Sequence, residues 1–237
     1  MFVFENLLRN EYFPAELPPC FHSESFANKH VQIYDFVKDK ELNPSDPLTF
    51  SGYKNTNSRR KFAIPNPYQY ARAVYVIVNN SDDIFALYES NSASLTVPLN
   101  KIPGKNECYK KPTAKISESK ERIKKLYQNN LYEIRLDIQS FFDSVYTHSI
   151  AWAMHTKSVA KKNKRDKSLV GNQIDNCLQN LNSGQTNGIL VGNAVSRIVS
   201  EIILCSVDKE IKSRMIGINY LRYVDDYYIF VKDSSQI

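Results

Sequence analysis

Two adjacent carboxylates, Asp225 and Asp226, stand between two apolar, β-prone runs near the end of the sequence. Asp is depleted inside strands and favoured in turns, so we expect residues 219–224 and 227–232 to pair as a hairpin with both acids at its bend. Carboxylate oxygens are ligands that hard divalent cations prefer. The pair therefore predicts a cation site at the tip of the hairpin, although two adjacent aspartates also occur in ordinary solvated turns.

A third carboxylate, Asp137, closes another alternating apolar run at residues 131–138. This run predicts a strand that ends at Asp137. Phosphoryl transfer by two metal ions needs acids from different chain segments, which hold a pair of cations against the attacking and leaving oxygens. We therefore predict that Asp137 and Asp225 bridge two Mg²⁺ ions. Asp143, a little further along, is either a third acid of this site or a residue that caps or orients the next helix.

Between these segments, residues 188–198 predict a glycine-bearing turn that opens a helix. Gly188 and Gly192 give the turn its conformational freedom. The apolar positions that follow are spaced as on one face of a helix, at residues 195, 198, 199, 202 and 205. The backbone of such a turn can pass close beneath a base pair or a sugar.

In this order, the three segments resemble motifs A, B and C of the reverse transcriptase palm, with residues 223–226 as the family's Tyr-x-Asp-Asp. Upstream, residues 59–65 resemble the basic fingers segment that contacts the incoming triphosphate in these polymerases. Further likenesses point to the bacterial abortive-infection reverse transcriptases, a phage-defence group; they fall at residues 64–67, 146–152, 171–175 and 184–188. The resemblance covers about residues 50–233.

The resemblance implies a set of site residues. Asp137, Asp225 and Asp226 would be catalytic, and together with Ile138 they would hold two Mg²⁺ ions, for which Mn²⁺ can substitute. Nucleotide-binding residues would be Arg59, Arg60, Lys61, Phe142, Val191 and Gly192. Among the basic residues we favour Arg60, because a planar guanidinium makes bidentate bonds to phosphate. The simpler interpretation of this basic triplet is a solvated loop.

Two positions bear on the kind of synthesis that the resemblance implies. Phe142 falls at the family's steric-gate position, where a bulky ring clashes with a ribose 2′-OH and so favours dNTPs over rNTPs. Many templated reverse transcriptases carry Gln where this chain has Val191, just before Gly192. Members of the abortive-infection group make DNA without a template and prime on a protein hydroxyl. The resemblance therefore implies untemplated synthesis, and the absence of Gln at Val191 agrees with it.

Three functions stay open from the sequence. The first is a two-metal DNA polymerase in anti-phage abortive infection, template-independent and protein-primed. The second is a conventional template-directed RNA-dependent DNA polymerase, and the third is a catalytically silent assembly module. The expected partners are dNTPs, a DNA product, an RNA or DNA template and, by resemblance, further copies of the chain in a homo-oligomer.

The resemblance also implies the fold class and the domain organisation. We expect an α+β fold with the fingers and palm of a right-hand polymerase, in which an antiparallel palm sheet packs on helices. Residues 1–45 would extend the fingers, 46–130 would form them, and 131–237 would form the palm. The sequence ends eleven residues after Asp226, so we expect a truncated piece without the thumb or the C-terminal helical region.

Local patterns predict helices near residues 2–10, 26–40, 70–79 and 117–128, and one that runs from about residue 147 to 167. Residues 44–70 contain Pro, Asn and Ser around the basic triplet, which predicts a mobile loop. His148 and His155 are expected to cap or to pack.

Composition agrees with a nucleotide-handling protein. The chain has 31 Lys and Arg against 25 Asp and Glu, a surplus that tolerates phosphate ligands without indicating a polybasic binder. Its four cysteines are scattered, which indicates neither a zinc site nor a disulfide framework. The sequence has no apolar stretch of about 18 residues and no secretory N-terminus, so we expect a cytoplasmic protein with no membrane partner.

Overall fold

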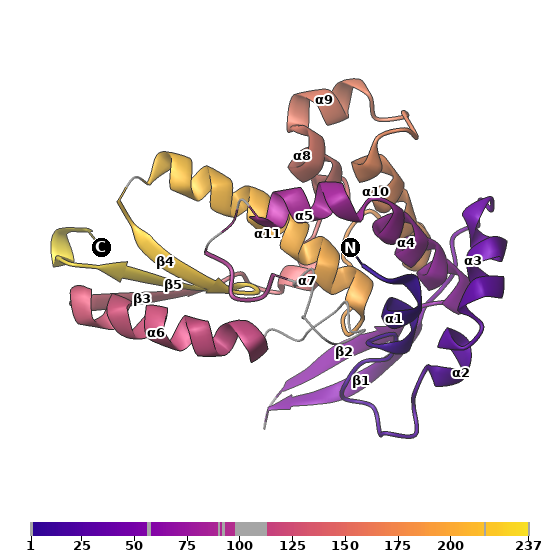
Figure 1. Cartoon of the computed structure of the whole chain (residues 1–237), viewed down its shortest axis with the longest axis horizontal. Helices are drawn as coiled ribbons and strands as arrows, with labels where there is room; N and C mark the ends of the chain where they lie inside the picture. The colour runs from indigo at the N-terminus through magenta and orange to yellow at the C-terminus, as the bar shows by residue number, and fades with distance from the viewer. Residues whose placement is uncertain are drawn as a thin grey trace.

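The computed structural model describes residues 2–55, 58–89, 91, 93–97, 113–215 and 217–236 and shows an α+β protein with two small antiparallel sheets. A long helix, α11 (Ala194–Arg214), runs through the middle of the molecule (Figure 1). In Figure 1 a three-stranded sheet lies to the lower left of α11, most other helices lie to its upper right, and a two-stranded hairpin lies below the start of α11. The expected fold class is therefore confirmed at the level of α+β.

The three-stranded sheet has the order β3-β5-β4. Its members are β3 (Tyr132–Asp137), β4 (Asn219–Tyr223) and β5 (Asp226–Val231), and both pairings are antiparallel. The strand that ends at Asp137 and the hairpin of β4 and β5 are thus confirmed. The prediction that both acids lie at the bend is wrong, because Asp226 is the first residue of β5 and pairs with Tyr223. A two-residue bend remains, which matches the twist of paired strands.

The two faces of this sheet have different neighbours. Tyr220 and Tyr227 stack with ring centroids 6.0 Å apart, and Tyr220 donates from its hydroxyl to the carbonyl of Asp208 on α11. On the other face, the ring of Tyr127 in α6 (Thr113–Asn129) lies edge-on to Phe230 at 5.2 Å. Side chains alternate along a strand, so Asp226 shares the face of Phe230, away from α11.

The remaining helices form a packed layer beside α11. Within it, α4 contacts α1, α3, α10 and α11, and α8 contacts α10 and α11. α4 begins with a strong start signal: Asn66 accepts hydrogen bonds from the amides of Tyr68 and Gln69, and Pro67 is the first helical residue. The helices are α1 (Phe4–Arg9), α2 (Glu24–Ala27), α3 (His30–Lys38), α4 (Pro67–Asn79), α5 (Ser81–Glu89), α7 (Phe141–Ser144), α8 (Ser149–His155), α9 (Lys157–Lys162) and α10 (Val170–Leu181), with a 3-10 turn at Ser234–Gln236.

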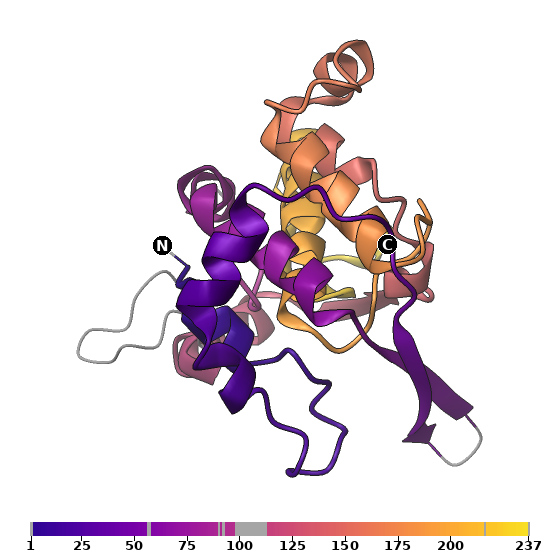
Figure 2. The same ribbon diagram turned by 90° about the vertical axis from the view of Figure 1, so that its right-hand side faces the viewer.

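The prediction of a mobile loop at residues 44–70 is wrong. Strands β1 (Leu48–Asn55) and β2 (Ser58–Ile64) pair there as an antiparallel hairpin, which projects away from the helices (Figure 2). Phe50 and Phe62 stack across the strands with centroids 5.4 Å apart. The prolines that suggested a loop all flank the hairpin, at residues 44, 47, 65 and 67, where they do not interrupt its ladder.

Two of the predicted long helices are each divided in two. The expected helix at residues 26–40 is α2 followed by α3. The expected helix at 147–167 is α8 followed by α9, because Thr156 between them has φ +69, which no helix accommodates. The helices predicted near residues 2–10, 70–79 and 117–128 are confirmed as α1, α4 and α6. No helix in the described part of the chain combines the length and apolar character of a membrane span.

Candidate active site

The end of the three-stranded sheet brings together the three predicted catalytic acids. Asp137, the last residue of β3, lies directly opposite Asp226, the first residue of β5. The amide of Ile138 donates to the carbonyl oxygen of Asp225 at 3.3 Å, so the segment after β3 is tied to the bend between β4 and β5. Two segments far apart in the sequence therefore meet at these residues. The catalytic roles assigned to them stay a prediction.

The bend itself is strained. Val224 has φ +55, in the left-handed region that β-branched residues rarely occupy. Such a conformation costs about 1–3 kcal/mol and persists only where the surroundings enforce it. Strained residues cluster at functional sites, and this one stands directly before Asp225. Sequence reasoning missed it, because the bend carries no glycine or asparagine that would announce a positive φ.

The surroundings of Asp225 raise the cost of ionising its carboxyl group. Burial is the main cause that raises the pKa of the half-buried Asp225, and the charges of Asp137 and Asp226 raise it further. The hydrogen bond from the Asp225 amide and the positive charge of Arg60 act in the opposite direction. A divalent cation would relieve this repulsion, because it favours the charged form of each carboxylate.

The donor set suits a hard cation, although a closed ligand shell is not preassembled. Asp137 is exposed, whereas Ile138, Asp225 and Asp226 are half-buried, so oxygen ligands and access from solvent are both present. Within the described residues, no three His, Cys, Asp or Glu side chains are grouped closely enough to hold a metal ion. These residues thus offer the oxygen ligands that Mg²⁺ prefers, and the strand register brings them to one end of the sheet. Their side chains are not arranged as a complete coordination shell.

The predicted glycine turn and its helix are confirmed. Gly188 and Gly192 have φ +82 and +104, values that a side chain would strain. Asn193 caps α11, since its side chain accepts from the amide of Ser196 at 3.0 Å. The amide of Ile189 donates to the carbonyl of Phe142 at 2.8 Å, which joins this turn to α7.

A cleft of about 300 Å³ opens where β2, α7 and the glycine turn meet. Lys61 and Val191 line it, and the amide of Ala63 in β2 donates to the Val191 carbonyl at 3.4 Å. Asp143 also lines the cleft; it is exposed, and α8 has no side-chain cap, so the capping interpretation of Asp143 is wrong. Two of the predicted nucleotide-binding residues, Lys61 and Val191, therefore share a cleft with a further acid, Asp143.

The basic triplet separates into three environments. Arg59 binds the neighbouring strand β1. Its Nε donates to the Ser51 hydroxyl oxygen at 2.7 Å, and its Nη2 donates to the Ser51 carbonyl at 2.6 Å. Arg60 is exposed, and its charge reaches Asp225. Lys61 faces the cleft. The arrangement agrees with the preference for Arg60 as a phosphate ligand and gives Arg59 a structural contact.

Phe142 is half-buried against the hydrophobic core, with its ring edge-on to Phe141 at 5.4 Å. Its contact with a sugar stays a prediction. The histidines have structural partners: His148 pairs with Asp175, and His155 Nε2 accepts from the Gly171 amide in the first turn of α10. The expectation that these histidines cap or pack is confirmed.

The N-terminal segment secures the glycine turn, which sequence reasoning missed. A Cβ on Gly192 would lie 2.6 Å from the Cγ atom of Pro14, so only glycine fits there. The amide of Ala194 donates to the carbonyl of Glu11 at 2.9 Å, and Arg197 pairs with the Glu11 carboxylate at 3.0 Å. No local pattern signals these contacts, because they join residues about 180 positions apart.

Comparison with known proteins adds one match. A family model described as reverse transcriptase (RNA-dependent DNA polymerase) matches residues 67–237. The matched range contains β3, β4, β5 and α11, and with them Asp137, Asp225, Asp226 and the glycine turn. No curated protein matches the chain.

Proposed function

Because this chain belongs to the reverse transcriptase (RNA-dependent DNA polymerase) family, we propose that it adds deoxynucleotides to a 3′ or protein hydroxyl and that Asp137, Asp225 and Asp226 are its catalytic acids. The observation that carries the proposal is the register of the three-stranded sheet, which sets Asp137 opposite Asp226 and beside the Asp225 bend. In the reaction, the hydroxyl oxygen bonds to the α-phosphorus of the dNTP, and pyrophosphate leaves.

Asp137, Asp225 and Asp226, with Ile138 beside them, would hold two Mg²⁺ ions, or Mn²⁺ in their place. When bound, the ions supply charge neutralisation for the attacking and leaving oxygens. Arg60 would pair with phosphate oxygens, since it is exposed and its positive charge acts on Asp225. Arg60 would thus bring the triphosphate to the acids while Lys61 contributes a second positive charge from the cleft.

Nucleotide selection would depend on the cleft between β2, α7 and the glycine turn. Val191 lines this cleft, where it offers an apolar side chain in place of an amide. Gly192 follows it in the turn and leaves room for Pro14. Phe142 would exclude a ribose 2′-OH. The proposed fingers therefore include β2, and the proposed palm includes β3, β4, β5 and α11.

For the finer function, we infer untemplated, protein-primed synthesis in anti-phage abortive infection. The support is the likeness of several sequence segments to that group together with Val191 at the cleft. The second candidate is conventional template-directed synthesis, which the description of the matched family favours because it names an RNA-dependent polymerase.

The experiment is incorporation of labelled dNTPs in Mg²⁺ by the purified protein, with and without an added RNA template and primer. Label that migrates with the protein and appears without template supports untemplated, protein-primed synthesis. Label that appears only with template and follows its sequence supports the second candidate. If neither condition yields product, the polymerase proposal fails, and a catalytically silent role takes its place.

A further inference from the structure

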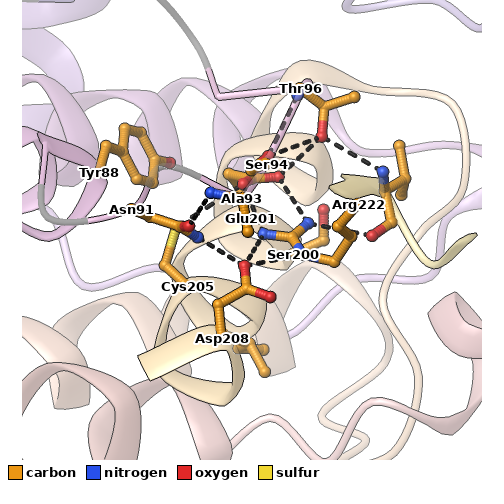
Figure 3. A network of polar contacts seen from close by, with 12 residues as sticks. Tyr88, Asn91, Ala93, Ser94, Thr96, Ser200, Glu201, Cys205, Asp208 and Arg222 are labelled. Carbon is orange, nitrogen blue, oxygen red and sulfur yellow. Dashed lines mark hydrogen bonds and ion pairs between the residues drawn. The ribbon is translucent and has the colours of Figure 1, made fainter. Parts of the chain in front are cut away.

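A buried polar network lies behind β4 (Figure 3). It contacts Val224, the residue before Asp225 in the bend. At its centre, the side chain of Arg222 is fully buried, with Nη2 2.8 Å from Glu201 and 2.7 Å from Asp208. Both acids belong to α11 and are themselves buried. Arg222 therefore fastens β4 to the long helix that begins at the glycine turn.

The same network holds the backbone of the strained Val224 on both sides. The Val224 amide donates to the hydroxyl oxygen of Thr96 at 3.3 Å, and Nη1 of Arg222 donates to the Val224 carbonyl at 3.0 Å. The next peptide group is held as well, by the hydrogen bond from Ile138 to the Asp225 carbonyl. Three successive peptide groups are thus fixed, and the Cα atom of Asp225 lies between two of them.

The Glu201 carboxylate links the two groups that hold Val224. Oε2 of Glu201 accepts from the Thr96 hydroxyl at 3.0 Å and from Nη1 of Arg222 at 3.2 Å. The segment that carries Thr96 is in turn fixed to β4, since the amide of Leu95 donates to the Arg222 carbonyl at 2.8 Å. The groups that bind the amide and the carbonyl of Val224 therefore share a partner and cannot move independently.

We propose that Thr96 and Arg222 are positioning residues that act through Val224 to hold the Asp225 carboxylate where it binds a divalent cation. The inference rests on the proposed function. Functional groups must be held within about 0.5 Å of their productive geometry. The pairing of Tyr223 with Asp226 limits how far the bend can change, and the two hydrogen bonds fix the peptide groups on both sides of Val224 within it. Without these bonds Val224 can relax further from φ +55, and the direction of the Asp225 side chain would change with it.

The test uses Thr96→Val, which keeps the shape of the side chain and removes the hydroxyl, and Thr96→Ser, which keeps the hydroxyl. Tyr88→Phe is the matched control: it removes a buried hydroxyl that donates to the Ile198 carbonyl on α11 at 2.8 Å, away from the bend. Arg222→Lys is a second variant, because an ammonium keeps the charge but cannot reach both acids and the Val224 carbonyl together. Thermal unfolding of each variant establishes that it is folded.

Mn²⁺ binding is measured by electron paramagnetic resonance, and kcat and KM are measured for dNTP incorporation. We expect Thr96→Val to weaken Mn²⁺ binding and to lower kcat by about tenfold each, with KM for dNTP nearly unchanged. Thr96→Ser should restore both values, Tyr88→Phe should match the wild type, and Arg222→Lys should resemble Thr96→Val.

Two results would overturn the inference, and they are distinguishable. If the wild type binds Mn²⁺ and incorporates dNTPs while folded Thr96→Val and Arg222→Lys do the same with equal affinity and kcat, the network is merely structural. If the wild type neither binds Mn²⁺ nor incorporates dNTPs, the proposed function fails, and this inference fails with it.

Discussion

Two clusters of charged side chains lie on the same sheet and differ in how their charges are balanced. Behind β4, Arg222 pairs with Glu201 and Asp208 in full burial, and although burial alone would lower the pKa of Arg222, the two carboxylates raise it above the usual range. At the sheet end, Asp137 lies opposite Asp226 and beside the Asp225 bend, and the positive charge of Arg60 acts on Asp225. Opposite charges in the first cluster pair with one another in the interior, whereas the like charges in the second would be available to the proposed cations.

Substitutions in the two clusters should change the stability of the fold in opposite directions. Removing Arg222 leaves two acids buried without their partner, which destabilises the folded state. Removing an acid from the sheet end relieves repulsion, so it should stabilise the fold while it abolishes the proposed chemistry. Stability and activity should therefore separate between the two clusters.

The largest effect on stability is expected from Arg222→Met. This change keeps much of the side-chain volume and leaves Glu201 and Asp208 without their buried counter-charge. We expect the free energy of unfolding to fall by about 3–5 kcal/mol, as measured by urea denaturation. A loss below about 1 kcal/mol, the range of exposed ion pairs, would mean that the network contributes little and would break the comparison.

A smaller effect of opposite sign is expected from Asp225→Asn without divalent cations. The folded-state pKa of Asp225 is raised, so its ionised form costs stability at neutral pH, and a neutral amide removes that cost. Because the carboxylate is only half-buried, we expect a gain on the order of 1 kcal/mol in urea denaturation at pH 7. The wild type regains this stability as pH falls below the unfolded-state pKa of Asp, so the difference between the proteins should vanish there.

The control for that measurement is Asp233→Asn. Backbone and side-chain hydrogen bonds from Ser235 lower the pKa of Asp233, so this acid has no repulsion to relieve. Asp233→Asn should therefore not stabilise the protein. If both variants gain equally, the gain reflects the overall loss of a negative charge rather than the crowding of acids at the sheet end.

The smallest effect is expected from the surface ion pair of Lys167 and Glu41. Their side chains are 80% and 83% exposed, so water and salt screen the pair. Lys167→Ala should leave the melting temperature within error of the wild type. A decrease in melting temperature as large as that of Arg222→Met would contradict the interpretation that burial is what makes the Arg222 ion pairs important for stability.

The sequence predicts the parts of this molecule that local patterns specify. The strand that ends at Asp137, the hairpin with Asp225 at its bend, and the glycine turn before α11 all depend on alternation, helical spacing and turn residues within a few positions. The β1–β2 hairpin was missed because the prolines beside it suggested a loop, whereas the pairing of Phe50 with Phe62 depends on the opposite strand.

Other features depend on contacts between distant residues and had no signal in the sequence. Thr96 and Val224 are 128 positions apart, and Arg222 is separated from Glu201 by 21. A lone Arg before Tyr223 gives no sign that it is buried, since arginine is usually exposed. The close approach of Pro14 to Gly192 was likewise unpredictable from either residue alone.

The most direct test of the central claim is incorporation of labelled dNTPs in Mg²⁺ by the wild type, Asp225→Asn and Asp233→Asn, with template and without it. We expect Asp225→Asn to lose on the order of 1,000-fold in rate, because the proposed cation ligand is lost, and Asp233→Asn to keep the wild-type rate. Equal rates for all three proteins would contradict the assignment of the sheet-end acids as the catalytic site.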